Sequence, residues 1–371
     1  MSKIKILHII KSLGRGGAEM LLPETLSLHN NSQFEFHYIY FLPWKDQMVQ
    51  TIKRHGGKVT CFPVKNNLSL LLQTSKVSHY CRKEKIDVIH CHLPWSGFLG
   101  RLVHLKTQIP LLYTEHNIQE RYHFATRSLN KMSFNSQNMV LGVSEDVSTS
   151  IRNNIEPTIP VRTLLNGVNT AKFKRNDKRR VEIRDQFAIP QDAIVVGNIA
   201  VFREQKNIPL WLKAFSEIAQ NSENVFGILV GAGPEEEKIK SMIRELGLEK
   251  HVVLPGLQTD TVAYFSAMDI FMMSSDFEGL PVALLEAMSM QCAVVSTKAG
   301  GVVEVVRDGI DGMLCEVGDK RCLADQVLVL VQDYAQREKM QSAARERVVE
   351  GFSLRGMVDE LEEIYCEVLK K

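Results

Sequence analysis

Residues 269–297 decide the fold, and they read DIFMMSSDFEGLPVALLEAMSMQCAVVST. The stretch begins with a short apolar run, 269–275, and ends with a second one, 292–297; each has the length and composition of a buried strand. Between them, residues 281–290 have a helical pattern, and Pro281 suits the first turn of a helix. A strand, a helix and a second strand in this order predict parallel strands joined by a crossover helix.

The same alternation continues along the whole chain. The predicted strands are residues 3–10, 34–42, 58–64, 86–93, 110–116 and 139–144, then 193–202, 225–233 and 251–256, and the two strands of 269–297. The predicted helices are residues 18–29, 70–85, 210–220, 235–246 and 281–290, with a long helical region from about residue 319. Strands that alternate with helices predict an α/β fold with two Rossmann-like, doubly wound parallel sheets.

The boundary between the two predicted sheets falls in NGVNTAKF, residues 166–173, just before a basic run. We therefore expect an N-terminal domain over residues 1–170 and a C-terminal domain over residues 171–354. Residues 355–371 form a last helix. Ligands of such sheets bind outside the carboxyl ends of the strands, so two domains facing each other would hold ligands in a cleft.

The composition fits a globular protein of two domains, with 371 residues, 44% of them apolar and 24% charged. Seven cysteines without metal-type pairing argue against a disulfide framework and fit a reducing cytosol. No run reaches the roughly 18 apolar residues of a membrane span. Residues 1–170 hold 20 Lys and Arg against 11 Asp and Glu, a balance of +9. We expect a cytoplasmic protein, at most peripheral on the inner face of a membrane, and an anionic partner for the first half.

A Gly-rich loop, SLGRGGAE, follows the first predicted strand and contains Gly14, Gly16 and Gly17. Such a loop suits a tight strand-to-helix turn, or a backbone that approaches an anion at a helix start. A dinucleotide fingerprint would need the spacing GxGxxG and an acidic residue at the end of the second strand. Both are missing here, so the loop does not predict a dehydrogenase.

The loop and helix from Glu278 to Glu286 hold two carboxylates. Gly279 and Leu280 are expected at the helix start, where free N–H groups accept a diphosphate. Glu286 lies among apolar neighbours and needs partners, because an unpaired buried carboxylate is costly. Sugar or ribose hydroxyls would supply them; a Lys or Arg in a helix contact is the alternative.

With these motifs the chain resembles the family-four retaining glycosyltransferases, which have the GT-B fold. EGLPVALLE matches their E-x7-E segment, and GRGGAE, DVIHCHLPWSG, YTEHN, GVSEDV and LLNGVNTAKF extend the match over nearly the whole chain. The resemblance implies that Glu278 holds donor-sugar hydroxyls and that Glu286 holds the ribose. Further donor contacts are implied for Gly16, Gly17, Leu254, Gly256, Leu257, Gly279, Leu280 and Val282.

The family also places an Arg and, five residues later, a Lys after the first strand of the second domain. Lys206 matches the Lys, but Val201 stands at the Arg position, and Arg203 is the nearest substitute. Cations there would stabilise the charge that develops on a leaving diphosphate. His116 in YTEHN is implied to contact the donor sugar, with a structural histidine as the alternative.

Other candidate residues have weaker support. His90 and His92 share one face of a strand and could ligate zinc, but no acidic residue or Cys pair nearby completes a site. No D-x-D segment occurs in the strand-end loops, so we expect no metal, and we expect no cofactor. Glu115 could act on an acceptor or point elsewhere. Trp95 could stack on a sugar or belong to the core.

The resemblance implies a retaining glycosyltransferase that uses a UDP- or GDP-linked sugar, and the missing D-x-D segment predicts that it is metal-independent. Its acceptor is expected to be a glycan or lipid-linked glycan at an anionic membrane surface, in cell-surface polysaccharide or glycolipid synthesis; no nucleic-acid partner is expected. By the resemblance, the last helix crosses back onto the first domain. A nucleotide-sugar epimerase of the same fold and a catalytically silent nucleotide-sugar-binding subunit remain alternatives, the second favoured by Val201.

Overall fold

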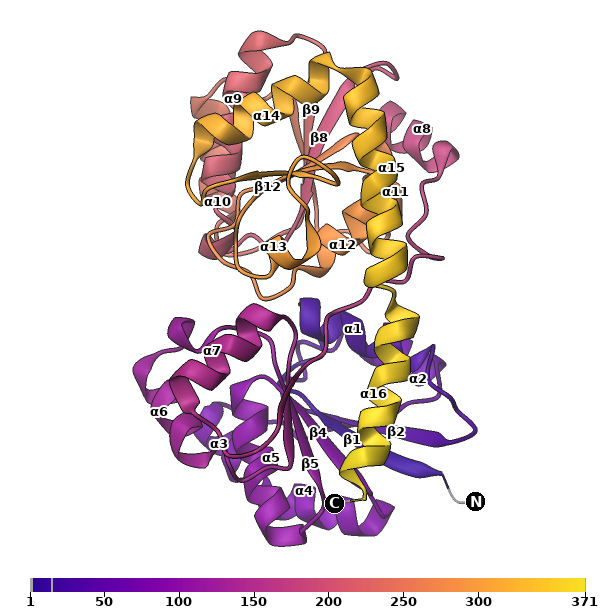
Figure 1. Ribbon diagram of the computed structural model, residues 1–371, viewed down its shortest axis with the longest axis vertical. Coiled ribbons are helices and arrows are strands. Elements are labelled where there is room, and N and C mark those ends of the chain that lie inside the picture. The colour runs from indigo at the N-terminus through magenta and orange to yellow at the C-terminus, as the bar shows by residue number, and fades with distance from the viewer. Residues whose placement is uncertain (1–2, 15, 371) are drawn as a thin grey trace. The chain divides into compact units, whose positions relative to one another are not determined.

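The computed structural model describes residues 3–14 and 16–370 (Figure 1). The chain divides into two compact units. Unit 1 comprises Met1–Asn166 together with Leu354–Lys371, and unit 2 comprises Gly167–Ser353. Each unit is an α/β domain built around one parallel sheet, as predicted. Among the described residues, no helix is both long and apolar enough to cross a membrane.

Unit 1 contains a seven-stranded sheet in the order β3-β2-β1-β4-β5-β6-β7. The strands are β1 (Ile4–Ile9), β2 (Phe34–Tyr40), β3 (Lys58–Cys61), β4 (Val88–His92), β5 (Leu111–Glu115), β6 (Met139–Gly142) and β7 (Val161–Thr163). All neighbouring pairs are parallel. The first six strands match the predicted runs. Strand β7, an edge strand of three residues without a buried side chain, was not predicted.

The helices of unit 1 cover both faces of this sheet. They are α1 (Gly17–Leu26), α2 (Val49–Arg54), α3 (Asn67–Leu71), α4 (Thr74–Glu84), α5 (Pro94–Thr107), α6 (Phe124–Ser133), α7 (Glu145–Ile155), α16 (Leu354–Val368) and the 3-10 turn η1 (Gln119–Arg121). The single helix predicted over 70–85 is two helices, α3 and α4. A capping box between Asn66 and Ser69 starts α3 before the predicted position.

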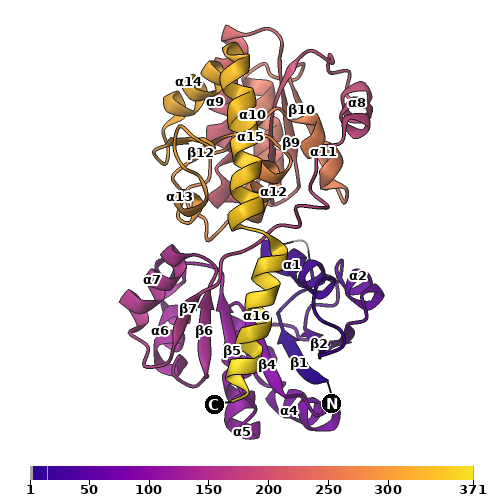
Figure 2. The same cartoon turned by 45° about the vertical axis from the view of Figure 1, so that its right-hand side comes forward.

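Helix α16 completes the core of unit 1 (Figure 2). Its side chains Leu361, Ile364 and Tyr365 are buried together with Leu22 of α1 and Phe36 of β2. Tyr365 is fully buried. Segments from both ends of the chain therefore share one hydrophobic core.

Unit 2 contains a six-stranded parallel sheet in the order β10-β9-β8-β11-β12-β13. The strands are β8 (Ile194–Ile199), β9 (Val225–Val230), β10 (Val252–Gly256), β11 (Ile270–Met273), β12 (Ala293–Thr297) and β13 (Met313–Cys315). Strand β13, another three-residue edge strand, was not predicted. The predicted strands of residues 269–297 are β11 and β12, which pair in parallel as expected.

The helices of unit 2 are α8 (Asp177–Gln186), α9 (Ile208–Asn221), α10 (Glu236–Glu245), α11 (Thr261–Ala267), α12 (Val282–Ser289), α13 (Val302–Val305), α14 (Lys320–Gln332), α15 (Tyr334–Gly351) and the 3-10 turn η2 (Glu204–Lys206). They include all the predicted ones, with one start shifted, and also α8, α11 and α13, which were not predicted. Pro281 is not in the first turn of α12. It is the N-cap residue, with an extended backbone, so the helix starts at Val282.

A buried carboxylate fastens α8 to the sheet of unit 2. Asp269 accepts ion pairs from Arg175 at 3.3 Å, Arg180 at 2.9 Å and Arg184 at 2.7 Å, and it also accepts the backbone N–H of Val195. Burial by itself would raise the pKa of Asp269, but these arginines lower it below its usual value. The basic stretch before β8 is therefore partly structural.

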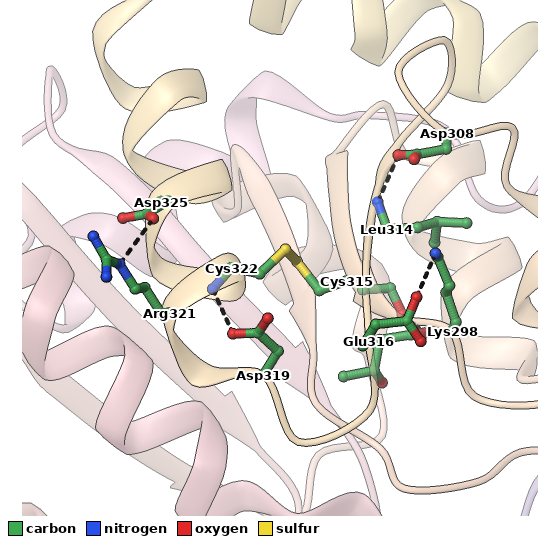
Figure 3. The surroundings of a disulfide bond; sticks show 11 residues. Lys298, Asp308, Leu314, Cys315, Glu316, Asp319, Arg321, Cys322 and Asp325 are labelled. Carbon is green, nitrogen blue, oxygen red and sulfur yellow. Dashed lines mark hydrogen bonds and ion pairs between the residues drawn. A yellow bond between two sulfur atoms is a disulfide. The ribbon is translucent and has the colours of Figure 1, made fainter.

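One disulfide bond joins Cys315 at the end of β13 to Cys322 in α14 (Figure 3). This bond differs from the expectation that the cysteines, which lack metal-type pairing, form no disulfide framework and fit a reducing cytosol. Asp319 caps α14 by accepting the N–H of Cys322, and this cap brings the second cysteine back toward β13. Five cysteines are free in the described chain.

Candidate functional site

Each sheet has a point where the strand order reverses, and most predicted site residues lie near these points. In unit 1 the reversal falls between β1 and β4, and in unit 2 between β8 and β11. Open α/β sheets bind ligands in the crevice outside the carboxyl ends of the strands at such a switch point. A ligand-binding site is therefore expected at each of these two switch points.

In unit 2 the switch point brings Lys206 and Glu278 together. Lys206 ends the turn after β8, and Glu278 lies in the loop after β11. The Lys206 Nζ donates to Glu278 Oε1 at 2.5 Å, and Ser275 Oγ donates to the same oxygen at 2.6 Å. Glu278 is buried, with 7% of its surface exposed. The pair juxtaposes a cation and an acceptor at a strand-end loop, the combination that a phosphorylated sugar requires.

Several hydrogen bonds hold the two loops in this position. Ser274 Oγ donates to the carbonyls of Lys206 at 3.0 Å and Asn207 at 2.9 Å. The Asn207 side chain donates to Asp276 Oδ1 at 2.8 Å. The N–H of Asp276 donates to the Gln205 carbonyl at 2.8 Å. Because these bonds tie the loops to each other, the positions of the Lys206 and Glu278 side chains are coupled.

Helix α12 begins directly after this loop. Gly279 and Leu280 precede it, and the N–H of Gly301 donates to the Gly279 carbonyl at 3.0 Å, which fixes the approach to the helix. Leu280 is buried, whereas Val282 at the helix start is half-buried. Glu286 lies on the second turn and is 7% exposed. The helix start and the two carboxylates thus belong to one continuous segment.

Arg203 does not join the Lys206–Glu278 pair. Its side chain is exposed, and within residues 3–14 and 16–370 it forms no hydrogen bond or ion pair with another side chain. Its N–H donates to the carbonyl of Val201 at 2.8 Å. Val201 itself is half-buried, so no cation occupies the expected Arg position.

The residues predicted to meet the nucleobase lie at the end of β10. Leu254 packs against the core of unit 2, whereas Leu257 is exposed. Gly256 has φ of +75°, a conformation that favours glycine, and its carbonyl accepts the N–H of Gly231. Gly231 also approaches the Ala200 carbonyl so closely that a Cβ would clash with it. Gly231 and Gly256 thus allow the loops that contain them to pack closely.

In unit 1, Gly16 and Gly17 lie at the start of α1. Gly16 is the N-cap and Gly17 the first helical residue. The Glu19 carboxylate folds back over Gly16 and accepts a hydrogen bond from Ser12 Oγ at 2.8 Å. A Cβ at Gly16 would clash with this carboxylate, whereas Gly17 borders open space. Gly17 is therefore the more accessible of the two predicted donor contacts.

Glu115 organises the turn that carries His116. It is fully buried and accepts hydrogen bonds from Tyr113 Oη at 2.8 Å, Gln119 Nε2 at 2.9 Å and Tyr122 Oη at 2.5 Å, and from the N–H of His116 at 2.9 Å. Burial raises its pKa above the usual value. Since Glu115 points inward and is saturated, it holds the turn and does not contact an acceptor.

His116 is the last member of a row of histidines at the switch point of unit 1. His8 Nδ1 and His92 Nε2 share a hydrogen bond of 2.9 Å, and His92 Nδ1 and His116 Nε2 share one of 3.4 Å. His90 bonds Tyr365 Oη at 2.8 Å and Thr114 Oγ1 at 2.7 Å. Burial lowers the pKa of all four, to about 3 for His8 and about 4 for His116.

In this row of neutral rings, the tautomer of each histidine fixes the tautomer of the next. A neutral imidazole has one donor and one acceptor nitrogen, so the tautomer of His8 determines that of His92, and His92 determines that of His116. The four rings line a cavity of about 30 Å³, room for about two water molecules. His92 is therefore placed to orient His116, a role that sequence reasoning did not assign.

His8 also corrects the expectation about metal ligands. The register of β1 on β4 aligns His8 with His90, and the ligand atoms of His8, His90 and His92 lie within 4.8 Å of one another. A third potential ligand is thus present, although the sequence showed none nearby. The ring nitrogens are nevertheless engaged with one another, with Tyr365 and with Thr114, so hydrogen bonds account for the arrangement.

The structure thus brings together some predicted residues and leaves others apart. Lys206, Glu278 and the start of α12 form one group in unit 2. His116 joins His8 and His92 in unit 1. The signal that could have indicated these groups is the strand order, because adjacent strands at a switch point end at the same edge of the sheet.

Comparisons with known families cover most of the chain. Residues 179–347 match the family described as Glycosyl transferases group 1, and residues 16–172 match the family described as Glycosyltransferase Family 4. The boundary between the two matches lies close to that between the two units of the fold.

Individual relatives are distant but match over most of their length. The N-acetyl-alpha-D-glucosaminyl L-malate synthase of Bacillus anthracis is 26% identical over 81% of this chain and 80% of its own. The UDP-Gal:alpha-D-GlcNAc-diphosphoundecaprenol alpha-1,3-galactosyltransferase of Escherichia coli is 24% identical over 99% of this chain and 98% of its own. The crystal structure of Anabaena HepE with UDP and glucose superposes with a TM-score of 0.88, at 22% identity, over 98% of this chain and all of that one.

Proposed function

Because the chain belongs to the group 1, family 4 glycosyltransferases, which have the GT-B fold, we propose that it transfers a sugar with retention of configuration from a nucleoside-diphosphate sugar. The observation that carries this proposal is the 2.5 Å contact between Lys206 and Glu278 beside the start of α12. UDP is the favoured nucleotide and GDP the alternative. The E. coli relative's name contains UDP-Gal, and a solved structure of HepE contains UDP-glucose.

Unit 2 supplies the donor contacts in this proposal. Lys206 leaves Glu278 and binds the diphosphate, assisted by the exposed Arg203, while Glu278 accepts hydrogen bonds from sugar hydroxyls. The N–H groups from Gly279 to Val282 face the phosphates and sugar, where a helix start favours anions. Glu286 accepts the ribose hydroxyls. Main-chain groups of residues 254–257 contact the base, and Gly16 and Gly17 of unit 1 add contacts to the donor.

The chemical step breaks the bond between the anomeric carbon and the diphosphate oxygen and forms one to the acceptor oxygen. The departing diphosphate takes the acceptor's proton, so no protein carboxylate has to attack the sugar. Lys206 and Arg203 stabilise the charge that develops on the diphosphate. His116 orients the reacting sugar through one hydroxyl. Among the described residues, the group of side chains that could hold a metal ion is His8, His90 and His92, whose ring nitrogens take part in hydrogen bonds, and neither Glu278 nor Glu286 belongs to it. We propose that transfer is metal-independent.

Unit 1 binds the acceptor, for which we propose a glycan or lipid-linked glycan of cell-surface polysaccharide or glycolipid synthesis. The E. coli relative, whose name specifies a diphosphoundecaprenol-linked acceptor, supports this class. The excess of 9 positive charges in residues 1–170 favours an anionic acceptor and an anionic membrane surface. The protein would then act in the cytoplasm, on the inner face of a membrane.

Nucleotide binding and transfer test the proposal in two stages. A thermal-shift series with UDP, GDP, ADP and their sugars identifies the base, because a ligand of the native state raises its stability. Glu286→Gln should abolish the shift, whereas Glu249→Gln, which alters an exposed carboxylate between α10 and β10, should keep it. Transfer to diphosphoundecaprenol-linked sugars, with and without a chelator, then tests the reaction. An anomeric product of opposite configuration would contradict retention, and a loss of activity restored by manganese would contradict metal independence.

Val201 favours one other reading, a catalytically silent binding subunit. Tight nucleotide binding without hydrolysis or transfer to any acceptor would support that reading. Conversion of the donor alone into an isomeric nucleotide sugar would instead identify an epimerase.

A further inference from the structure

Helix α6 in unit 1 buries a polar side chain and leaves its large apolar side chains exposed. Phe124 and Met132 are 80% and 84% exposed, and Leu129 is also exposed. Asn130 on the same helix is fully buried. With 3.6 residues per turn, the three apolar residues fall within an arc of roughly 140°, on the side opposite Asn130. A helix that packs by its apolar face would have the reverse arrangement.

A buried arginine explains how α6 is held by its polar side. Arg101 of α5 donates to Asn130 Oδ1 at 3.0 Å and to Ser133 Oγ at 2.8 Å, and its guanidinium lies 5.0 Å from the centre of the Phe134 ring. Asn130 in turn donates to Gln119 at 3.1 Å. The apolar side of α6 is therefore not needed to fix the helix, and it is left facing outward.

Neighbouring helices extend this apolar surface. Helix α5 contacts both α6 and α3, and the three are labelled together in unit 1 of Figure 1. Leu68 and Leu72 at α3 are 69% and 75% exposed, and Leu102 and Leu105 of α5 are exposed as well. We call the whole set the α3–α5–α6 face; its apolar residues are Leu68, Leu72, Leu102, Leu105, Phe124, Leu129 and Met132.

The three helices of this face carry charges of one sign, although acidic side chains lie on adjoining elements: Glu120 of η1 interacts with Arg127, and Glu145 and Asp146 begin α7, which contacts α6. Residues 47–83, 88–114 and 121–144, which contain all three helices, include no Asp or Glu. Exposed cations are present on the same helices: Arg127 and Lys131 flank the apolar arc of α6, and Lys106 follows Leu105. An interface with a protein partner would not require that these helices carry charges of only one sign. Exposed apolar side chains on helices that carry cations and no acidic residue match the interface of a bilayer with anionic headgroups.

We propose that the α3–α5–α6 face docks on an anionic phospholipid bilayer, with Phe124 and Met132 entering the headgroup boundary and Arg127 and Lys131 meeting the headgroups. This inference rests on the proposed function, because a lipid-linked acceptor must be reached at a membrane surface. Beyond that function, the inference identifies the face of unit 1 that contacts the membrane.

Vesicle co-sedimentation of the full chain tests the face. Vesicles of phosphatidylcholine alone are compared with vesicles that also contain phosphatidylglycerol. Wild type should bind the anionic vesicles preferentially. Phe124→Ser with Met132→Ser should weaken that binding about tenfold or more, and Arg127→Glu with Lys131→Glu should weaken it by at least about twentyfold and remove its salt dependence.

Matched controls come from unit 2. Val303→Ser with Ile310→Ser removes two apolar side chains that are 52% and 55% exposed, and Lys250→Glu with Lys339→Glu makes the same charge change. Both control variants should bind vesicles about as wild type does. Because all the substituted residues are exposed, thermal midpoints and the nucleotide thermal shift should stay unchanged in every variant.

Three results would overturn the inference, and none of them depends on sugar transfer. The first is wild-type binding that is no stronger to anionic than to neutral vesicles. The second is preferential binding that both face variants retain, which would place the membrane contact elsewhere and leave the proposed enzyme intact. The third is concentration-dependent dimerisation in sedimentation velocity that the Phe124→Ser, Met132→Ser variant abolishes, which would make the face a contact between copies of this chain.

Discussion

Replacing Lys206 by Met examines the donor site most directly. Met keeps most of the aliphatic stem and removes only the cation. In unit 2 the Lys206 Nζ lies 2.5 Å from Glu278 Oε1, and Ser275 Oγ is the other donor to that oxygen, at 2.6 Å. Without the cation, Glu278 remains 7% exposed and loses its ion pair.

The structure sets the size of two separate effects. At 2.5 Å and an effective dielectric constant of about 20, the gross attraction is roughly 7 kcal/mol, and desolvation of both ions offsets most of it. Because the Lys206 side chain is still 22% exposed, we expect the free energy of unfolding to fall by about 1–3 kcal/mol. For transfer, loss of a positioned charge at the diphosphate should lower kcat by about 10²–10³-fold.

Urea denaturation and steady-state nucleotide release measure these effects independently. In a Glu278→Gln background the stability loss from Lys206→Met should shrink, since no buried carboxylate is left unpaired. The loss of kcat should persist there. Lys213→Met on α9 is the matched control and should change neither quantity. Arg203→Met should lower kcat by only about tenfold, because an exposed cation is screened.

Two outcomes would refute the role given to Lys206. One is a kcat for Lys206→Met within about fivefold of wild type. The other is a loss of kcat that disappears in the Glu278→Gln background, which would mean that Lys206 only neutralises Glu278.

The histidines and the disulfide lead to three further predictions. His92→Leu should lower kcat about tenfold with little change in KM for the donor, because His116 loses the ring that orients it; a KM effect alone would contradict this. The folded-state pKa of His8, about 3, lies below its unfolded value, so stability is full above about pH 6.5 and is lost as the pH falls toward 3. His8→Gln should reduce that slope in urea denaturation by up to about 1.4 kcal/mol per pH unit, and an unchanged slope would show that His8 does not contribute. Cys322→Ser should lower the free energy of unfolding by about 2 kcal/mol under oxidising conditions and by nothing in excess dithiothreitol, where Cys315 is already reduced; equal losses in both would assign the effect to packing.

Most of the strands that the sequence predicted have side chains buried on both faces, although the predicted edge strands β3 and β10 are only partly buried. Near-continuous apolar runs such as β11 and β12 give that signal. The missed strands β7 and β13 have three residues each and lie at sheet edges, where composition is not constrained by burial. The start of α12 shifted by one residue because Pro281 fits a cap as well as a first turn.

The sequence predicted which residues belong to the candidate site better than it predicted the contacts between them. The spacing of Glu278 and Glu286 is local, so one helix start positions both. The pairing of Lys206 with Glu278 depends on β8 lying beside β11, and the approach of His8 to His92 depends on β1 lying beside β4. Strand order is a property of the whole sheet, and no short motif contains it.

The inverted α6 shows a different limit. A helical pattern reveals that one face is apolar, but it does not reveal which face meets the core. The buried partner, Arg101, lies on another helix, so the orientation of Phe124 and Met132 could be read only from the structure.

The contribution of α16 to the core of unit 1 also has a consequence for biosynthesis. The segment Leu354–Val368 is made after all of unit 2, yet Tyr365 bonds His90 inside unit 1. On the ribosome, unit 2 can therefore finish folding while the earlier-made unit 1 still exposes the apolar groove that Leu361 and Ile364 will fill. The nascent N-terminal half would depend on chaperones until the last helix emerges, and a stop codon before Leu354 would leave it permanently unfinished.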